Sequence, residues 1–427
     1  MKNTVLAAIV VIVVVIVIVA SLAVILMRPS PSTASDMYTP NVVSAQDVGR
    51  SLGGTWSQKV GTAGVIHNYG GFESLINMST GYGVGLNFAP AEFYSHTTLV
   101  PSMYSSIASG STFLNSSSST NYVFPVSSFE LGIFAPSKMG FASVGYVQFT
   151  NSDYSTSIFN SIYQNVTNVS TTSYMTYRGD YNGSDFVYAW NSTMIGQGSN
   201  AHNYNLSVLV GLDKPYLIYI FYLVTGNESL QSFENLFSTQ VSMVAQISSS
   251  VRSDFVSSSD LNTTLKSDYL QEIAAQVSIS NASQMLNTIY SLEGYSSSYS
   301  SSVSQYSALV NQTIGNLTGL GLAAYLGNNS GNMSAVMVGY ASFLSDNASL
   351  ELFTLLEAYS HIHEITVNGY NALELNETVS VSGQTFSEGF IVVDYKNTLV
   401  SALVAGSLSL TMSQLSTIAQ DQMSLMK

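Results

Sequence analysis

The sequence predicts an α+β fold, in which an N-terminal transmembrane helix is followed by two tandem repeats, each an antiparallel sheet covered by helices. Three observations lead to this prediction. An uncharged apolar run occupies Val5–Met27, a short phrase recurs 194 positions apart, and matching hairpin signals follow each copy of the phrase. Together they indicate one membrane anchor and two similar bodies.

The apolar run near the N-terminus is long enough to cross a membrane. Val5–Met27 contains no charged residue over 23 positions. As a helix it would measure about 35 Å, against a hydrocarbon layer of roughly 30 Å. A cleavable signal peptide is the alternative, with a small-residue site at 20–23, but its apolar part is usually about 7–15 residues long. We therefore expect an uncleaved signal-anchor, with a cytoplasmic tip at 1–4 and a stalk at 28–40.

The repeated phrase suggests that the rest of the chain is duplicated. Residues 144–149 read Val-Gly-Tyr-Val-Gln-Phe, and residues 338–343 read Val-Gly-Tyr-Ala-Ser-Phe. The alternation of apolar residues with others along the phrase predicts a core strand in each copy. The glycine predicts that a helix or a neighbouring chain approaches the strand closely at that position. Coincidence among strands rich in Tyr and Val is the alternative interpretation.

The elements that follow each phrase also match. A helix is expected next, and in the second copy Leu352, Leu355 and Leu356 would share its buried face. Asn-Gly pairs at 182–183 and 368–369 then predict a tight hairpin in each copy.

A second hairpin and a closing helix complete each predicted repeat. The hairpins are expected at 206–224 and 389–406. Strand 216–224 has two apolar faces, which predicts a central strand covered on both sides, with docking of a partner on one side as the alternative. Each repeat therefore reads β-β-α-β-β-β-β-α. The predicted parts of the body are repeat 1 at 41–250, a linker at 251–260 and repeat 2 at 261–427.

The sequence is poor in charged residues and rich in uncharged polar residues. Charged residues are 8% of the chain, whereas Ser and Thr number 103 and Asn 31. The net charge is −14, and the sequence contains no cluster of Lys and Arg, so we expect no nucleic-acid partner. The absence of cysteine excludes disulfides and thiolate sites.

Neutral hydrogen-bonding groups work independently of acid, and sparse charge limits self-repulsion when carboxylates become protonated. In this respect the composition resembles that of the envelope glycoproteins of thermoacidophilic archaea, with no family motif behind the resemblance. The resemblance implies an acidic exterior. An ordinary Ser-rich secreted protein of a neutral habitat is the alternative.

Asn-x-Ser/Thr sequons are more numerous than the composition explains. There are 16 in the sequence, where about 7 would arise by chance. The excess favours an exported, N-glycosylated body, and clustering of Asn, Ser and Thr in turns is the alternative. The candidate acceptors are Asn77, Asn115, Asn165, Asn168, Asn182, Asn191, Asn205, Asn227, Asn262, Asn281, Asn311, Asn316, Asn328, Asn332, Asn347 and Asn376.

Candidate residues for chemistry are few. His361 and His363 would share one face of a strand, as metal ligands often do, and they are weak candidates because acid protonates imidazole. Paired carboxylates could support acid chemistry, with Asp180 and Asp185 as one pair and Glu374 and Glu377 as the other. We predict no catalytic residue, no cofactor and no metal beyond these weak candidates.

The sequence thus predicts a non-enzymatic surface protein with a structural, adhesive or assembly role. It would be a single-pass protein of the cell membrane, bound to lipid through Val5–Met27, with the C-terminal body outside the cytoplasm and other envelope proteins as possible partners. Two alternatives stay open: a receptor that binds a small solute or peptide in a cleft between the repeats, and an acid-active hydrolase.

Overall fold

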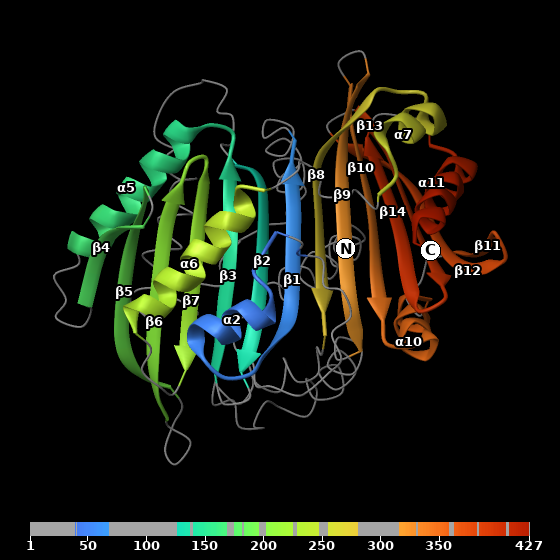
Figure 1. The fold of residues 1–427 in the computed structure, drawn as a ribbon. Helices are drawn as coiled ribbons and strands as arrows, with labels where there is room; N and C mark the ends of the chain where they lie inside the picture. Colours follow the sequence, from blue (N-terminus) through green and yellow to red (C-terminus); the bar gives the residue numbers. More distant parts are fainter. Residues whose placement is uncertain are drawn as a thin grey trace. The chain divides into compact units, whose positions relative to one another are not determined.

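The computed structural model describes residues 39, 41–67, 126–136, 140–168, 175–181, 183–195, 202–224, 229–246, 255–280, 316–329, 332–357, 363–381, 384–406 and 410–426. These residues belong to two compact units (Figure 1). Unit 1 runs from α2 (Ala45–Leu52) to α6 (Leu230–Val244), and unit 2 runs from α7 (Ser258–Leu265) to α11 (Met412–Leu425).

Unit 1 is built on a sheet whose strand order is β1-β2-β3-β7-β6-β5-β4, antiparallel from β2 to β4. Helix α5 (Ser152–Asn168) connects β3 to β4, and α2 and α6 lie across one face of the sheet (Figure 1). The strands are β1 (Trp56–Ile66), β2 (Val126–Pro136), β3 (Gly140–Phe149), β4 (Met175–Tyr181), β5 (Ser184–Ile195), β6 (His202–Asp213) and β7 (Tyr216–Val224).

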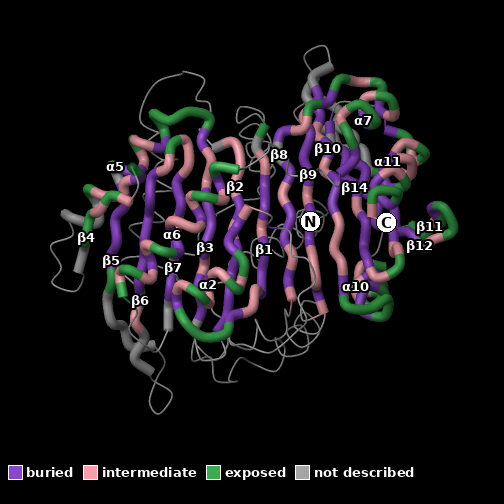
Figure 2. The backbone as a smooth tube through the Cα atoms, in the orientation of Figure 1, coloured by how far each residue is buried: buried purple, intermediate pink, exposed green. Residues whose placement is uncertain are grey.

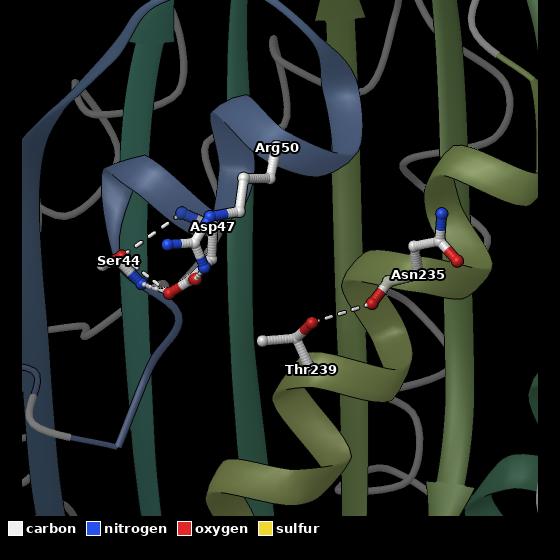
Figure 3. Close-up of polar contacts among 5 residues, drawn as sticks. All are labelled: Ser44, Asp47, Arg50, Asn235 and Thr239. Carbon is white, nitrogen blue, oxygen red and sulfur yellow. Dashed lines mark hydrogen bonds and ion pairs between the residues drawn. The ribbon is translucent and has the colours of Figure 1, made fainter.

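Polar side chains determine where α2 begins. The Ser44 hydroxyl accepts a hydrogen bond from the Asp47 amide at 3.2 Å, and the Asp47 carboxylate accepts one from the Ser44 amide at 3.0 Å. This reciprocal pair is a capping box, which satisfies amides that the first helical turn leaves without partners. Arg50 pairs with Asp47 at 3.0 Å, and in α6 the Thr239 hydroxyl donates to the Asn235 carbonyl at 2.9 Å (Figure 3).

The core of unit 1 lies between the sheet and the helices α2 and α6. Buried residues run along the strands, whereas exposed residues lie mainly on the helices and in the turns (Figure 2). Aromatic rings contribute much of the apolar area that drives folding. Members of this core include Val144 and Tyr146 of β3, Ile218, Ile220 and Tyr222 of β7, Phe233, Leu236 and Phe237 of α6, and Val48 and Leu52 of α2.

Unit 2 has the strand order β8-β9-β10-β14-β13-β12-β11, with antiparallel pairing throughout. Helix α10 (Asp346–Glu357) connects β10 to β11, and α7 and α11 contribute to the core. The strands are β8 (Tyr269–Ile279), β9 (Leu317–Asn329), β10 (Asn332–Phe343), β11 (His363–Val367), β12 (Tyr370–Val381), β13 (Gln384–Tyr395) and β14 (Thr398–Gly406).

The two units have the same order of helices and strands, and corresponding strands pair in the same way. The repeated phrase lies in β3 of unit 1 and in β10 of unit 2. The phrase ends alike in both: the Phe149 amide donates to the Pro215 carbonyl at 3.0 Å, and the Phe343 amide donates to the Asn397 carbonyl at 2.8 Å. Phe149 and Phe343 are both buried.

The short turn signals are confirmed where the structure describes them. Val367 pairs with Tyr370, so Asn368-Gly369 forms the two-residue turn between β11 and β12, with positive φ at both residues. Gly183 also has positive φ, whereas Asn182 lies outside the described residues. The prediction for 216–224 is confirmed as well, because β7 lies between β3 and β6 and buries Leu217 and Ile218 on its opposite faces.

The predicted fold class is wrong as stated. In the described residues strands outnumber helices, and each unit is built on one large, mostly antiparallel sheet. The strands are long, up to 13 residues in β9, so the sheet rather than a balanced α+β arrangement dominates. Within the described residues no helix has the length and apolarity needed to span a bilayer, so the predicted transmembrane helix is not supported. Val5–Met27 itself lies outside the described residues.

Part of the predicted linker is built into unit 2. Phe255 and Val256 are buried, and Ser257 caps α7 by accepting a hydrogen bond from the Asp260 amide at 3.2 Å. The same Ser-x-x-Asp spacing caps α2 in unit 1. Each unit therefore begins with one helix and one strand that the predicted order β-β-α-β-β-β-β-α did not contain.

Candidate functional site

A buried carboxyl group on β2 is the centre of the candidate site. Glu130 is 1% exposed, although it lies in the apolar run Phe-Glu-Leu-Gly-Ile-Phe of that strand. Its Oε1 accepts hydrogen bonds from the Asn41 side-chain amide at 2.6 Å and from the Tyr146 hydroxyl at 3.1 Å. Its Oε2 accepts one from the Asn41 backbone amide at 3.1 Å.

A second buried polar side chain completes this cluster, which we call the Glu130 cluster (Asn41, Glu130, Tyr146 and Gln240). Gln240 of α6 is fully buried. Its Nε2 donates to the Asn41 carbonyl at 2.8 Å, and its Oε1 accepts from the Val43 amide at 3.1 Å. The cluster therefore ties the segment before α2 to the sheet and to α6.

Burial controls the ionisation of this cluster. It raises the pKa of the Glu130 carboxyl, and the hydrogen bonds from Asn41 and Tyr146 oppose the increase without cancelling it. Burial, followed by the nearby Glu130, raises the pKa of the Tyr146 hydroxyl far above its ordinary value. In acid the cluster is thus a set of neutral groups joined by hydrogen bonds.

The sequence reasoning missed the Glu130 cluster. The available signal was a lone carboxylate inside an apolar strand, which is costly to bury unless it has partners. Tyr146 faces Glu130 on the next strand, but Asn41 is 89 positions away and Gln240, which bonds Asn41, is 199 positions from it, so no local pattern could have identified the whole cluster.

The predicted histidine site is only partly visible. His361 lies outside the described residues, and His363 is exposed at the start of β11, opposite Glu374 on β12. Burial raises the pKa of Glu374, and His363 opposes that increase. Across the described ranges, no group of three or more His, Cys, Asp or Glu side chains is placed to hold a metal ion. The weak metal prediction for His361 and His363 stays a prediction.

The two predicted carboxylate pairs differ in their surroundings. Asp180 and Asp185 occupy facing positions on β4 and β5, where Asp185 pairs with Arg178 at 3.5 Å and both partners are more than 40% exposed. Glu374 is buried on β12, and the side chain of Glu377 lies outside the described part. The structure brings together only the first pair, at a solvated hairpin end.

Five of the predicted glycan acceptors have described side chains. Asn347 in the first turn of α10 and Asn376 on β12 are exposed, whereas Asn205, Asn262 and Asn316 are partly buried. The side chains of the other eleven lie outside the described part: Asn77, Asn115, Asn165, Asn168, Asn182, Asn191, Asn227, Asn281, Asn311, Asn328 and Asn332.

The serine of the Asn347 sequon has a structural role of its own. Ser349 is fully buried, and its hydroxyl lies 2.9 Å from each of three acceptors: the Asp394 carboxylate and the carbonyls of Asp346 and Lys396. This hydroxyl attaches the start of α10 to the turn between β13 and β14. Because the hydroxyl is buried, an enzyme that reads the sequon would have to act before unit 2 folds.

Replacing this hydroxyl should destabilise unit 2. We expect Ser349→Ala to lower the free energy of unfolding by about 1–3 kcal/mol, since the one buried hydroxyl proton that Asp394 and two carbonyls share is lost. Ser349→Thr retains the hydroxyl and serves as the control. Denaturant unfolding measures the difference, and an unchanged midpoint for Ser349→Ala would contradict the assignment.

Comparisons of the chain with protein-family models, with curated proteins and with solved structures find no significant match.

Proposed function

We propose that the protein is a non-enzymatic, N-glycosylated cell-surface protein of an acidic exterior, with a structural, adhesive or assembly role among other envelope components. The observation that carries this proposal is the excess of sequons, 16 in 427 residues. Exposure of Asn347 and Asn376 on unit 2 supports it, because a glycan on either side chain can extend into solvent.

The electrostatics of the described residues support the acidic setting. The ion pairs between Arg50 and Asp47 and between Arg178 and Asp185 are both on the surface. Surface ion pairs add little to stability. Apolar burial and hydrogen bonds between neutral groups, such as those of Gln240 and Gln422, do not require ionised carboxylates.

Glycopeptide mapping tests the proposal. The full chain, expressed in an acidophilic archaeal host, should be found on membranes, should be cleaved by protease added to intact cells, and should carry glycan at Asn347. Asn347→Gln should remove that glycan and leave the others unchanged. Asn371→Gln, which changes an exposed asparagine of the same unit outside any sequon, should remove none. Unmodified sequons throughout, or complete protection in intact cells, would contradict the proposal.

A further inference from the structure

Unit 2 shows how this fold is built without the Glu130 carboxyl. In unit 1 Tyr146 of β3 pairs with Glu130 of β2, and in unit 2 the corresponding Tyr340 of β10 pairs with Gly321 of β9. The place of the carboxyl-bearing residue is thus taken by a residue with no side chain.

An aromatic ring fills the corresponding space in unit 2. The ring of Phe255 stacks on that of Tyr340, with centroids 5.8 Å apart and an interplanar angle of 29°. A β-carbon on Gly321 would overlap the Tyr340 ring, and Phe255 lies on the same side. Apolar packing by Phe255 and a hydrogen bond from the Tyr325 hydroxyl of β9 to the Val256 carbonyl hold the segment before α7 against the sheet.

The glutamine clamp, in contrast, is common to both units. Gln422 of α11 is fully buried, and its Oε1 accepts a hydrogen bond from the Val256 amide at 3.2 Å. Gln240 does the same for the Val43 amide in unit 1. The two units thus share the clamp and the tyrosine, and they differ in what lies between the tyrosine and the segment before the helix.

In unit 2 an aromatic ring contacts the segment before the helix, whereas in unit 1 a carboxyl group does. The carboxyl group differs from the ring in that it can gain or lose a proton. We propose that Glu130 and Asn41 form a proton-dependent latch, which holds residues 41–43 closed in acid and loosens them as the pH approaches neutrality. The described contacts of residues 255–256 in unit 2 are made by Tyr340, Tyr325 and Gln422 and include no carboxyl group, so we expect no comparable loosening there; the nearest acids on the elements around it are Asp421 and Asp260.

The physical reason is the cost of an ionised carboxyl in a buried place. The Glu130 carboxyl takes its hydrogen bonds from Asn41 and Tyr146, which are neutral donors. When Oε2 carries the proton, Oε1 still accepts both side-chain hydrogen bonds, and the hydroxyl oxygen Oε2 is a weaker acceptor for the Asn41 backbone amide. When it is ionised, the charge favours opening of the segment to water. The titratable side chains on the elements around the cluster, besides Tyr146, are Asp47, Arg50, Lys59, Asp213, Tyr216, Tyr219, Tyr222 and Glu234.

Hydrogen exchange of backbone amides tests the latch directly. The Asn41 and Val43 amides are bonded within the cluster, and the Val256 amide is the internal control. After correction for the intrinsic rate, protection of Asn41 and Val43 should fall about tenfold or more between about pH 4 and about pH 7, and protection of Val256 should not. An equal change at all three amides would overturn the proposal.

Two variants separate titration from packing. Glu130→Gln retains an acceptor without a titratable proton, so the pH dependence at Asn41 and Val43 should disappear. Tyr146→Phe removes one hydrogen bond and keeps the carboxyl, so protection should fall at every pH while the pH dependence persists. Persistence of the wild-type pH dependence in Glu130→Gln would overturn the proposal. If Glu130→Gln does not fold, loss of the pH dependence in Tyr146→Phe would do so.

Discussion

The protein should be more stable in acid than at neutral pH. Every described acid with a clear change has a pKa raised by the fold, and burial is the first cause in all but one of them. The exception is Glu357, whose pKa is raised first by its hydrogen bond with Glu364. The acids with raised pKa are Glu130, Asp213, Glu272, Glu357, Glu374, Asp394 and Asp421.

The direction follows from proton binding. A raised pKa means that the folded state binds a proton more tightly than the unfolded state. The resulting stabilisation is complete below the ordinary value near 4 and is lost as the pH rises through the higher folded value. Burial also lowers the pKa of Lys59. For this group the folded state binds the proton less tightly than the unfolded state, so the free energy of unfolding falls as the pH drops from alkaline values through the folded pKa.

Thermal unfolding measures this effect. Each unit of pKa change is about 1.4 kcal/mol, so we expect the melting temperature at about pH 4 to exceed that at about pH 7 by on the order of 5 °C. The increase should persist in about 1 M salt, because burial rather than surface charge causes it. A stability maximum near neutrality, with loss of stability below about pH 5, would contradict the prediction.

The glycine of the repeated phrase should be needed more in unit 1 than in unit 2. At Gly145 a β-carbon would overlap the Glu130 carbonyl and the hydroxyl of Tyr219, whose side chain lies over the glycine. At Gly339 the nearest atoms would be the Gly321 carbonyl at 3.0 Å and the Ser401 hydroxyl at 3.3 Å. We expect Gly145→Ala to cost about 2–3 kcal/mol and Gly339→Ala about 1 kcal/mol or less.

Denaturant unfolding of the two variants, side by side, checks this difference. Adding Tyr219→Ser to Gly145→Ala should recover part of the lost stability, because it removes the overlapping ring and leaves the backbone overlap. Equal losses in the two single variants, or no recovery in the double variant, would show that the close approach at Gly145 is not the cause.

Local features of the fold could be predicted from the sequence because they depend on local chemistry. Asn368-Gly369 forms the predicted turn, since both residues adopt positive φ readily. Strand 216–224 is central, as its two apolar faces indicate. The glycine of the phrase does permit a close approach, by the side chain of Tyr219 from the neighbouring strand β7.

Features that depend on distant contacts could not be predicted. In α10 Ala348, Ser349 and Phe353 are the buried residues; of the leucines predicted to share one face, Leu352 and Leu356 are partly buried, and the side chain of Leu355 lies outside the described part. Spacing alone allows either face, and the sheet beneath the helix decides between them. The Glu130 cluster escaped for the same reason, since its members come together only when the segment before α2 meets β2, β3 and α6.

The fold class was wrong because the order of the helices and strands was predicted without the lengths of the strands. The hairpins were located from their turns, but long strands such as β9 and β13 make the sheet larger than a balanced α+β unit. The sheet is antiparallel, which fits connections made by tight hairpins. The first helix and strand of each unit were missed because the Ser-x-x-Asp caps were not recognised: Ser44 lay at the start of the predicted repeat 1, and Ser257 lay in the segment assigned to the linker.

The number of protons exchanged on unfolding at about pH 5 is the most direct test of the claim that this fold favours neutral carboxyl groups. Calorimetric unfolding in buffers of different ionisation enthalpy measures it for the full chain. The account predicts a net release of protons, because the native state holds them more tightly than the unfolded chain. A net uptake of protons, as in proteins that depend on ionised carboxylates, would contradict it.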